Sequence, residues 1–138
     1  MKGLDSPVLI ALLRGDSAVR PLLDSISRDE VGTTEWDLLE VERAARADPS
    51  PGRQRRLLSV ERLRRAVTVL PLDERAARLA SPRVTAKDGT IQLATIWKLA
   101  ALEAAGADEW YTVRGRASGR PRGRVKVKHL PLRTSQTR

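Results

Sequence analysis

The chain has 138 residues, a length that suits one ordinary domain with a tail. It contains no cysteine and a single histidine, His129, which excludes disulfides, thiolate zinc sites and a His-based catalytic triad within one chain. The formal net charge is +9, and residues 109–138 carry nine basic side chains against one acidic side chain, the balance expected where a protein contacts a phosphate backbone.

The sequence shows no sign of a membrane or secretory segment. No apolar run reaches the roughly 18 residues that a transmembrane helix needs. The N-terminus reaches the acidic Asp5 almost at once, unlike a secretory signal. We therefore expect a cytoplasmic protein that does not contact a membrane. Any metal ion would have to be held by carboxylates, which favours magnesium or manganese.

The first part of the chain predicts a strand, two helices, a second strand and a third helix. Residues 2–5 are short and apolar, Ser6 can cap a helix, and Pro7 suits its first position. Gly15 ends this helix. The next elements, in order, are a helix over 17–26, a strand over 31–33 and a helix capped by Thr34 that runs to about Ala47.

After a loop over residues 48–52, helices and strands continue to alternate. The predicted elements, in order, are an arginine-rich helix over 54–65, a strand over 67–70, a helix from Asp73 to about Ser81, a helix over 90–105, a strand over 109–113 and a last strand over 125–128. Most connections between strands are too long for hairpins. The pattern therefore predicts an α/β fold with a short parallel sheet flanked by helices.

Four segments resemble the motifs of PIN-domain proteins. Residues 4–15 resemble the family's opening, in which an aspartate ends the first strand and precedes a small hydroxyl residue and a V-L-I helix. Residues 32–40 resemble its second motif, where a helix presents an acid. Residues 69–73 resemble its VLPLD turn, and residues 93–108 match the later helix and its GAD exit. The order and spacing of the four segments, more than any one of them, carry the resemblance.

The resemblance implies a PIN-like three-layer domain over residues 1–113, followed by an extended basic arm over residues 114–138. PIN domains are small α/β nucleases, in which three or four carboxylates gather at the carboxyl ends of the strands and hold magnesium or manganese. The metal activates water and stabilises the negative charge of a scissile phosphate. Many members are toxins of toxin–antitoxin pairs, usually homodimers, and others process ribosomal RNA.

The resemblance assigns Asp5 and Glu40 to the acidic site, but two further positions are substituted. Thr95 stands where the family has its third acid, and Arg114 falls near the fourth. Two carboxylates hold a magnesium or manganese ion only weakly, so we expect a vestigial site and no required cofactor. Asp88 precedes Thr95 by two helical turns, about 10 Å, which is too far to share one metal ion. We expect Asp88 to act as a cap.

Both assigned acids also have a plain structural interpretation. Asp5 stands directly before Ser6 and Pro7, where a carboxylate caps a helix. Glu40 stands three residues before Arg43 on the predicted helix, where the two side chains form a solvated ion pair. The sequence alone leaves both interpretations open.

Residues 114–124 alternate arginine with glycine, serine and proline, and offer nothing apolar to bury. The guanidinium group of arginine binds phosphates through two hydrogen bonds and stacks on bases, so the segment is expected to contact RNA. The alternative is that this segment is a solvated tail that keeps the protein soluble. The residues expected to contact RNA are Arg114, Arg116, Arg120, Arg122, Arg124, Lys126, Lys128 and Arg133. The arginines of residues 53–65 form a second basic cluster, either a solvated helix face or a second RNA surface.

The main hypothesis is an RNA-binding protein on a PIN-like fold that has lost nuclease activity. Ribosomal RNA is its expected partner, and the ribosome its expected place of association. The alternative is a metal-dependent endoribonuclease of the toxin–antitoxin type, with an antitoxin partner. A third reading is a homodimeric interaction protein that binds no RNA. The substitutions at Thr95 and Arg114 favour the first reading over the second, and the long basic arm favours the first over the third.

Overall fold

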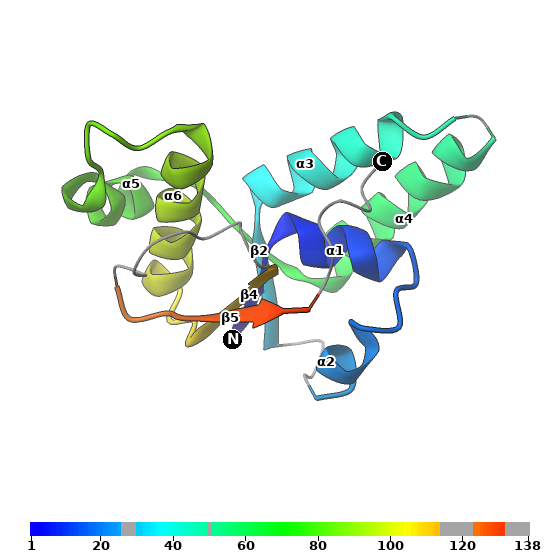
Figure 1. Cartoon of the computed structure of the whole chain (residues 1–138), viewed down its shortest axis with the longest axis horizontal. Coiled ribbons are helices and arrows are strands. Elements are labelled where there is room, and N and C mark those ends of the chain that lie inside the picture. Colours follow the sequence, from blue (N-terminus) through cyan, green and yellow to red (C-terminus); the bar gives the residue numbers. More distant parts are fainter. Residues whose placement is uncertain (26–29, 50, 114–122, 132–138) are drawn as a thin grey trace.

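A computed structural model describes residues 1–25, 30–49, 51–113 and 123–131 of the chain. Helices lie on both sides of a five-stranded sheet (Figure 1). The strands are β1 (Lys2–Leu4), β2 (Val31–Thr34), β3 (Thr68–Leu70), β4 (Glu109–Val113) and β5 (Lys126–Leu130). The helices are α1 (Ser6–Leu13), α2 (Arg20–Ser25), α3 (Glu35–Arg46), α4 (Gly52–Ala66), α5 (Glu74–Ala80), the short 3-10 helix η2 (Ser81–Arg83) and α6 (Thr90–Ala104).

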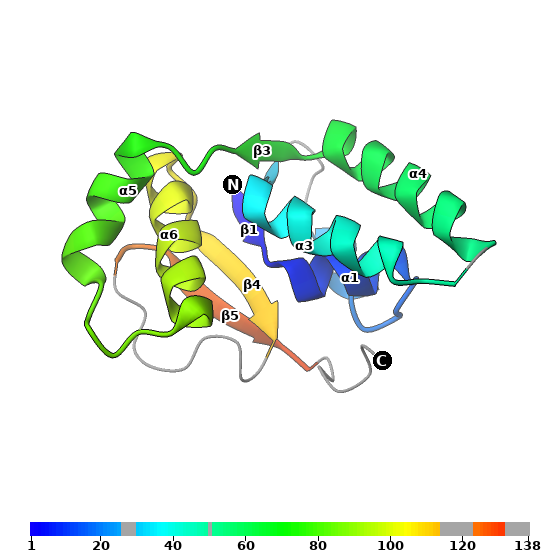
Figure 2. The same cartoon turned by 90° about the horizontal axis from the view of Figure 1, so that it is seen from above.

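The strands are ordered β3-β2-β1-β4-β5, and every neighbouring pair is parallel. Figure 2 shows β4 and β5 side by side, with their arrowheads pointing the same way. The chain builds outward from β1 on one side through β2 and β3, and then returns to the other side of β1 through β4. Such a reversal is the point at which open parallel sheets place their functional residues, at the carboxyl ends of the strands. The predicted α/β fold with a flanked parallel sheet is confirmed.

Local capping explains where several helices begin. The Thr34 side chain accepts from the backbone N–H of Asp37, and the Asp37 carboxylate accepts from that of Thr34, so the predicted cap of α3 is a reciprocal capping box. Asp73 caps α5 in the same way, through the N–H of Ala76. The cap of α1 is Asp5, which confirms the capping interpretation of this residue, whereas the cap predicted at Ser6 is wrong by one residue.

The second helix is shorter than the prediction of residues 17–26. The Asp16 side chain accepts a hydrogen bond of 2.9 Å from the N–H of Ala18, and the segment over 17–19 forms turns. This local bond competes with helix formation, as aspartate side chains often do. The helix therefore begins only at Arg20.

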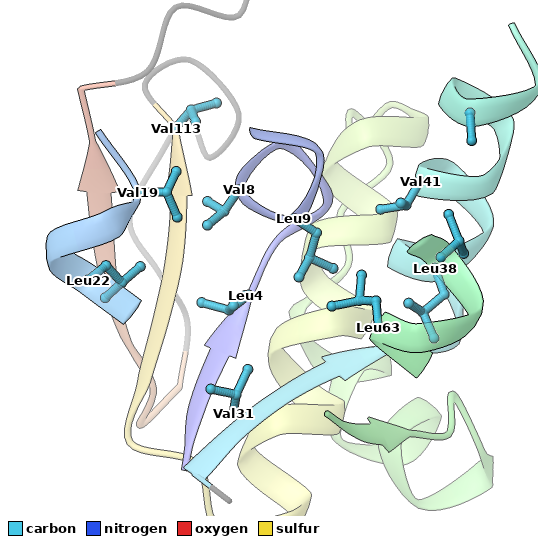
Figure 3. Close-up of a cluster of buried hydrophobic side chains, with 12 residues drawn as sticks. Leu4, Val8, Leu9, Val19, Leu22, Val31, Leu38, Val41, Leu63 and Val113 are labelled. Atoms are coloured by element: carbon cyan, nitrogen blue, oxygen red, sulfur yellow. The ribbon is translucent and has the colours of Figure 1, made fainter. Parts of the chain in front are cut away.

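Two hydrophobic clusters occupy opposite faces of the sheet. The first packs α1, α2, α3 and α4 against Leu4 and Val31, and Figure 3 shows these side chains converging with Leu9, Leu38 and Leu63. The second cluster packs α6 against the other face, with its large buried side chains on α6 and β4. The alternation of side chains along each strand produces this division.

Gly3 on β1 sets how closely α6 approaches the sheet. A Cβ atom at this position would lie 2.6 Å from the side chain of Leu102, so any larger residue would have to displace that side chain. Lys98 lies four residues before Leu102, on the same face of α6. The close packing of α6 on β1 therefore carries Lys98 toward the carboxyl end of that strand. Across the described ranges, no helix is long and apolar enough to span a membrane.

Candidate acidic site

Three carboxyl groups from different parts of the chain meet around one lysine. The Nζ atom of Lys98 lies 3.0 Å from Oδ1 of Asp5, 2.9 Å from Oδ1 of Asp37 and 2.8 Å from Oε1 of Glu40. Lys98, Asp5 and Asp37 are at most 2% exposed, whereas the Glu40 side chain is 31% exposed. The cluster therefore lies at the carboxyl end of β1, with Glu40 at its solvent side.

Asp5 is held by neighbours on both of its oxygens. Its Oδ1 atom accepts from the backbone N–H of Ser6 at 2.9 Å as well as from Lys98. Its Oδ2 atom accepts from the hydroxyl of Thr112 on β4 at 2.7 Å. The same carboxylate therefore caps α1, joins β1 to β4 and binds the lysine, so the capping interpretation and the site assignment hold together.

Ser6 connects the start of α1 with the two acids of α3. Its backbone N–H donates to Oδ1 of Asp37 at 3.0 Å, and its hydroxyl donates to Oε1 of Glu40 at 3.1 Å. The residue that follows the strand-end aspartate therefore orients both acids of α3. The predicted ion pair between Glu40 and Arg43 is replaced by these contacts with Ser6 and Lys98.

The electrostatics of the cluster follow from burial and mutual proximity. Burial raises the pKa of Asp37 to about 7, and the charge of Lys98 only partly opposes this shift. Burial by itself would lower the pKa of Lys98, but the carboxylates of Asp37 and Asp5 act in the opposite direction and raise it above its ordinary value. Lys98 therefore remains a charged ammonium ion at the centre of the acids.

The structure brings together the two acids that the sequence indicated, Asp5 and Glu40. Sequence reasoning missed Asp37 and Lys98. Asp37 has a ready explanation as the third residue of a capping box, which concealed its second role. Lys98 was detectable, because it interrupts the apolar face of α6 one turn before Leu102, where a solvated lysine has no place.

The remaining predicted positions lie apart from the acids or beyond the described residues. Thr95 is half-buried and stands one helical turn before Lys98 on α6. Asp88 lies in the loop before α6 and accepts from the N–H of Thr85 at 2.6 Å, so it closes a turn. Arg114 lies outside the described residues.

The basic residues expected to contact RNA lie partly within the described segments. Arg124, Lys126 and Lys128 are exposed, the latter two on the edge strand β5. The register pairs Thr112 with His129, so β5 runs directly beside the strand that contacts Asp5. The other predicted contacts, Arg114, Arg116, Arg120, Arg122 and Arg133, lie outside the described residues.

The arginines of α4 form a partly paired face. Arg64 forms an ion pair of 3.0 Å with Glu35 on α3, and Arg56 forms one of 2.5 Å with Asp48. Arg55, Arg62 and Arg65 are exposed. The face therefore serves partly to connect α4 with α3.

Sequence comparison agrees with this architecture. The profile of the PIN domain matches residues 3–106, which is most of the chain. The chain belongs to the PIN domain family. No curated protein matches the sequence.

Solved structures of toxin–antitoxin systems share the fold. A DNA-bound VapBC complex from Salmonella typhimurium has a TM-score of 0.70 at 16% identity, over 93% of this chain and 96% of that one. The sarcin-ricin loop cleaving VapC toxin of Mycobacterium tuberculosis has a TM-score of 0.65 at 18% identity, over 83% and 91%. A toxin–antitoxin complex from Klebsiella pneumoniae has a TM-score of 0.67 at 12% identity, over 88% and 93%. At these identities the likeness shows the fold alone.

The divalent metal ion associated with PIN nucleases does not fit the site of this chain. The converging oxygens of Asp5, Asp37 and Glu40 surround an ammonium nitrogen at hydrogen-bonding distances. Among the residues that the structure describes, no group of three or more His, Asp or Glu side chains is arranged to hold a metal ion. The carboxylate oxygens present here are arranged around the ammonium group of a lysine.

Proposed function

We propose that this PIN-domain protein acts by binding RNA beside its acidic site, through the exposed basic side chains of β5. The observation that carries the proposal is the position of Lys126 and Lys128, which are exposed on the edge strand next to β4. Adjacent strands lie about 4.8 Å apart, and Lys128 pairs with Tyr111, the residue before Thr112, so a polynucleotide that crosses the carboxyl ends of β1 and β4 has its phosphates within reach of this lysine. Lys126 lies two residues earlier on the same strand and extends the positive charge toward its amino end. Lysine and arginine supply the positive charge that such a contact requires.

A second candidate function is a metal-dependent endoribonuclease of the toxin–antitoxin type. The solved structures with this fold favour it, because they are toxins or toxin–antitoxin complexes. The convergence of three carboxyl groups at the carboxyl ends of parallel strands favours it as well. Under this candidate the partner is an antitoxin chain. The two candidates share RNA as the ligand and differ in whether the acidic site holds a metal ion.

RNA binding is tested by fluorescence anisotropy with labelled single-stranded RNA in the presence of EDTA. Reversing both charges in Lys126→Glu/Lys128→Glu is expected to weaken binding by more than tenfold, because two attractive contacts become repulsive. Lys87→Glu is the matched control, since Lys87 is exposed in the loop before α6. Unchanged affinity in the double variant would place the RNA site elsewhere, with the exposed arginines of α4 as the next surface to vary.

A further inference from the structure

We infer that the ammonium group of Lys98 takes the place of the divalent metal ion, so that the acidic site of this PIN domain binds neither magnesium nor manganese. The consequence for function, RNA binding without metal-dependent cleavage, rests on the proposed function. The binding of metal ions can nevertheless be measured without RNA.

The ammonium group of Lys98 contacts all three carboxyl groups of the cluster. An ammonium group has three N–H donors and no acceptor. Lys98 donates hydrogen bonds to Asp5 at 3.0 Å and to Glu40 at 2.8 Å, and its Nζ atom forms an ion pair of 2.9 Å with Asp37. These are the distances of charge-assisted hydrogen bonds. The ammonium group therefore faces all three acids and occupies the space between them.

Four oxygens of the three carboxyl groups already accept hydrogen bonds from protein groups other than Lys98. Oδ1 and Oδ2 of Asp5 accept from the Ser6 N–H and the Thr112 hydroxyl. Oδ1 of Asp37 accepts from the Ser6 N–H, and Oε1 of Glu40 accepts from the Ser6 hydroxyl. A magnesium ion demands near-ideal octahedral oxygens at roughly 2.0–2.1 Å and keeps several waters. Oxygens that already accept protein hydrogen bonds and surround an ammonium group offer no such geometry.

Lys98 cannot readily move aside. The residue is 2% exposed, and it projects from the middle of α6. The helix is held against β1 by the close contact between Gly3 and Leu102. A metal ion at this position would have to expel the buried ammonium group of Lys98 from its contacts with the three acids. Proximity of the three acids therefore depends on Lys98 as a permanent counter-ion.

Two positions of α6 change the charge of the site in the same direction. Thr95 stands where PIN proteins carry their third acid, which removes one negative charge. Lys98, one turn further along the same face, adds one positive charge. Together they convert a site for a divalent cation into one that a single ammonium ion balances.

The inference is tested by titrating manganese into the intact chain and measuring free manganese by electron paramagnetic resonance. The wild-type protein is expected to show no saturable binding up to millimolar metal. Lys98→Met, which removes the charge and keeps the length of the side chain, is expected to bind one manganese ion at least tenfold more tightly. Lys87→Met is the matched control and is expected to behave as wild type. One equivalent of manganese bound by wild type and lost in Asp5→Asn would overturn the inference.

A second measurement covers the case in which Lys98→Met does not fold. The buried, hydrogen-bonded ammonium of Lys98 is expected to give a slowly exchanging 15N-ammonium signal in the wild-type protein. Equimolar manganese is expected to leave that signal unbroadened, and its disappearance would contradict the inference. If the wild-type protein gave the expected manganese results but did not bind RNA, the proposed function would be refuted and the inference about Lys98 would stand.

Discussion

Thr112 on β4 and Asp5 at the end of β1 are joined by a buried hydrogen bond of 2.7 Å, which the threonine hydroxyl donates. Lys98 and the Ser6 N–H both donate to the other oxygen of Asp5. The carboxylate therefore has different partners on its two oxygens, a strand neighbour on one and a helix-borne charge on the other. Either partner can be removed while the other remains, which makes the two contributions separable.

Thr112→Val is expected to destabilise the fold by about 1–3 kcal/mol, because it leaves a buried carboxylate oxygen without its donor while preserving the shape of the side chain. Chemical denaturation measures the change. Thr68→Val is the control, because Thr68 is exposed on the edge strand β3. Equal free energies of unfolding for the two variants would show that the hydroxyl of Thr112 contributes nothing.

Lys98→Met is expected to lower the free energy of unfolding by about 3–5 kcal/mol, because removing one partner of a buried ion pair leaves the others uncompensated. Lys87→Met is expected to change it by less than about 0.5 kcal/mol, as exposed substitutions usually do. Adding Asp37→Asn to Lys98→Met is expected to recover part of the loss, since one buried charge then disappears. If the double variant is less stable than Lys98→Met, the carboxylates of Asp5 and Asp37 do not repel one another when Lys98 is absent.

The stability of the wild-type protein relative to Asp37→Asn is expected to fall as pH rises from about 4 to about 7. Burial raises the pKa of Asp37 from 3.8 to about 7, so the folded state holds this proton more tightly than the unfolded state does. The resulting stabilisation is fully present below the unfolded pKa and is lost as pH rises through the folded pKa. The difference between the two proteins should exceed about 1 kcal/mol over this window.

Denaturation at several pH values measures this difference. Comparison of the two proteins cancels the contributions of Asp108 and Glu109, whose pKa values are lowered chiefly by their hydrogen bonds with Lys2. Those two groups stabilise the fold at higher pH and lose this contribution as pH falls, so an uncorrected profile would mix opposite trends. A difference that stays constant with pH would mean that Asp37 titrates normally.

The order of helices and strands follows from the sequence because local signals mark each boundary. Thr34 caps α3 as its position predicted, α5 begins one residue after the predicted start at Asp73, and the β-branched segment before Asp73 forms β3. The prediction was less accurate where a side chain formed a local turn, as Asp16 does before α2. Boundaries therefore depend on hydrogen bonds of single side chains, which periodicity does not register.

Only two of the four residues of the site could be predicted from the sequence, for a different physical reason. Asp5 could be placed because it ends a strand, and the carboxyl end of a parallel strand is where such folds put functional groups. The meeting of Asp37 and Lys98 depends on how closely α6 packs against β1, which Gly3 permits. No pattern within either helix encodes a distance between them. A lone lysine on an apolar helix face was the one available signal.

The salt dependence of RNA binding tests whether β5 contacts phosphates. Each phosphate contact on single-stranded RNA contributes a log–log salt slope of about −0.7. Lys128→Ala is therefore expected to reduce the magnitude of the slope by about 0.7, and Lys126→Ala/Lys128→Ala by about 1.4. Point substitutions are preferable to deleting residues 114–138, because residues 126–130 form a strand of the sheet.

Anisotropy titrations over a series of salt concentrations give the slope, and Lys87→Ala is expected to leave it unchanged. Both lysines of β5 are exposed, so their removal should leave the far-ultraviolet circular dichroism spectrum as in wild type. A double variant that binds more weakly but keeps the wild-type slope would show that these lysines act through the fold or through uncharged contacts. In that case the phosphates of the RNA lie on another surface, and the role proposed for β5 is wrong.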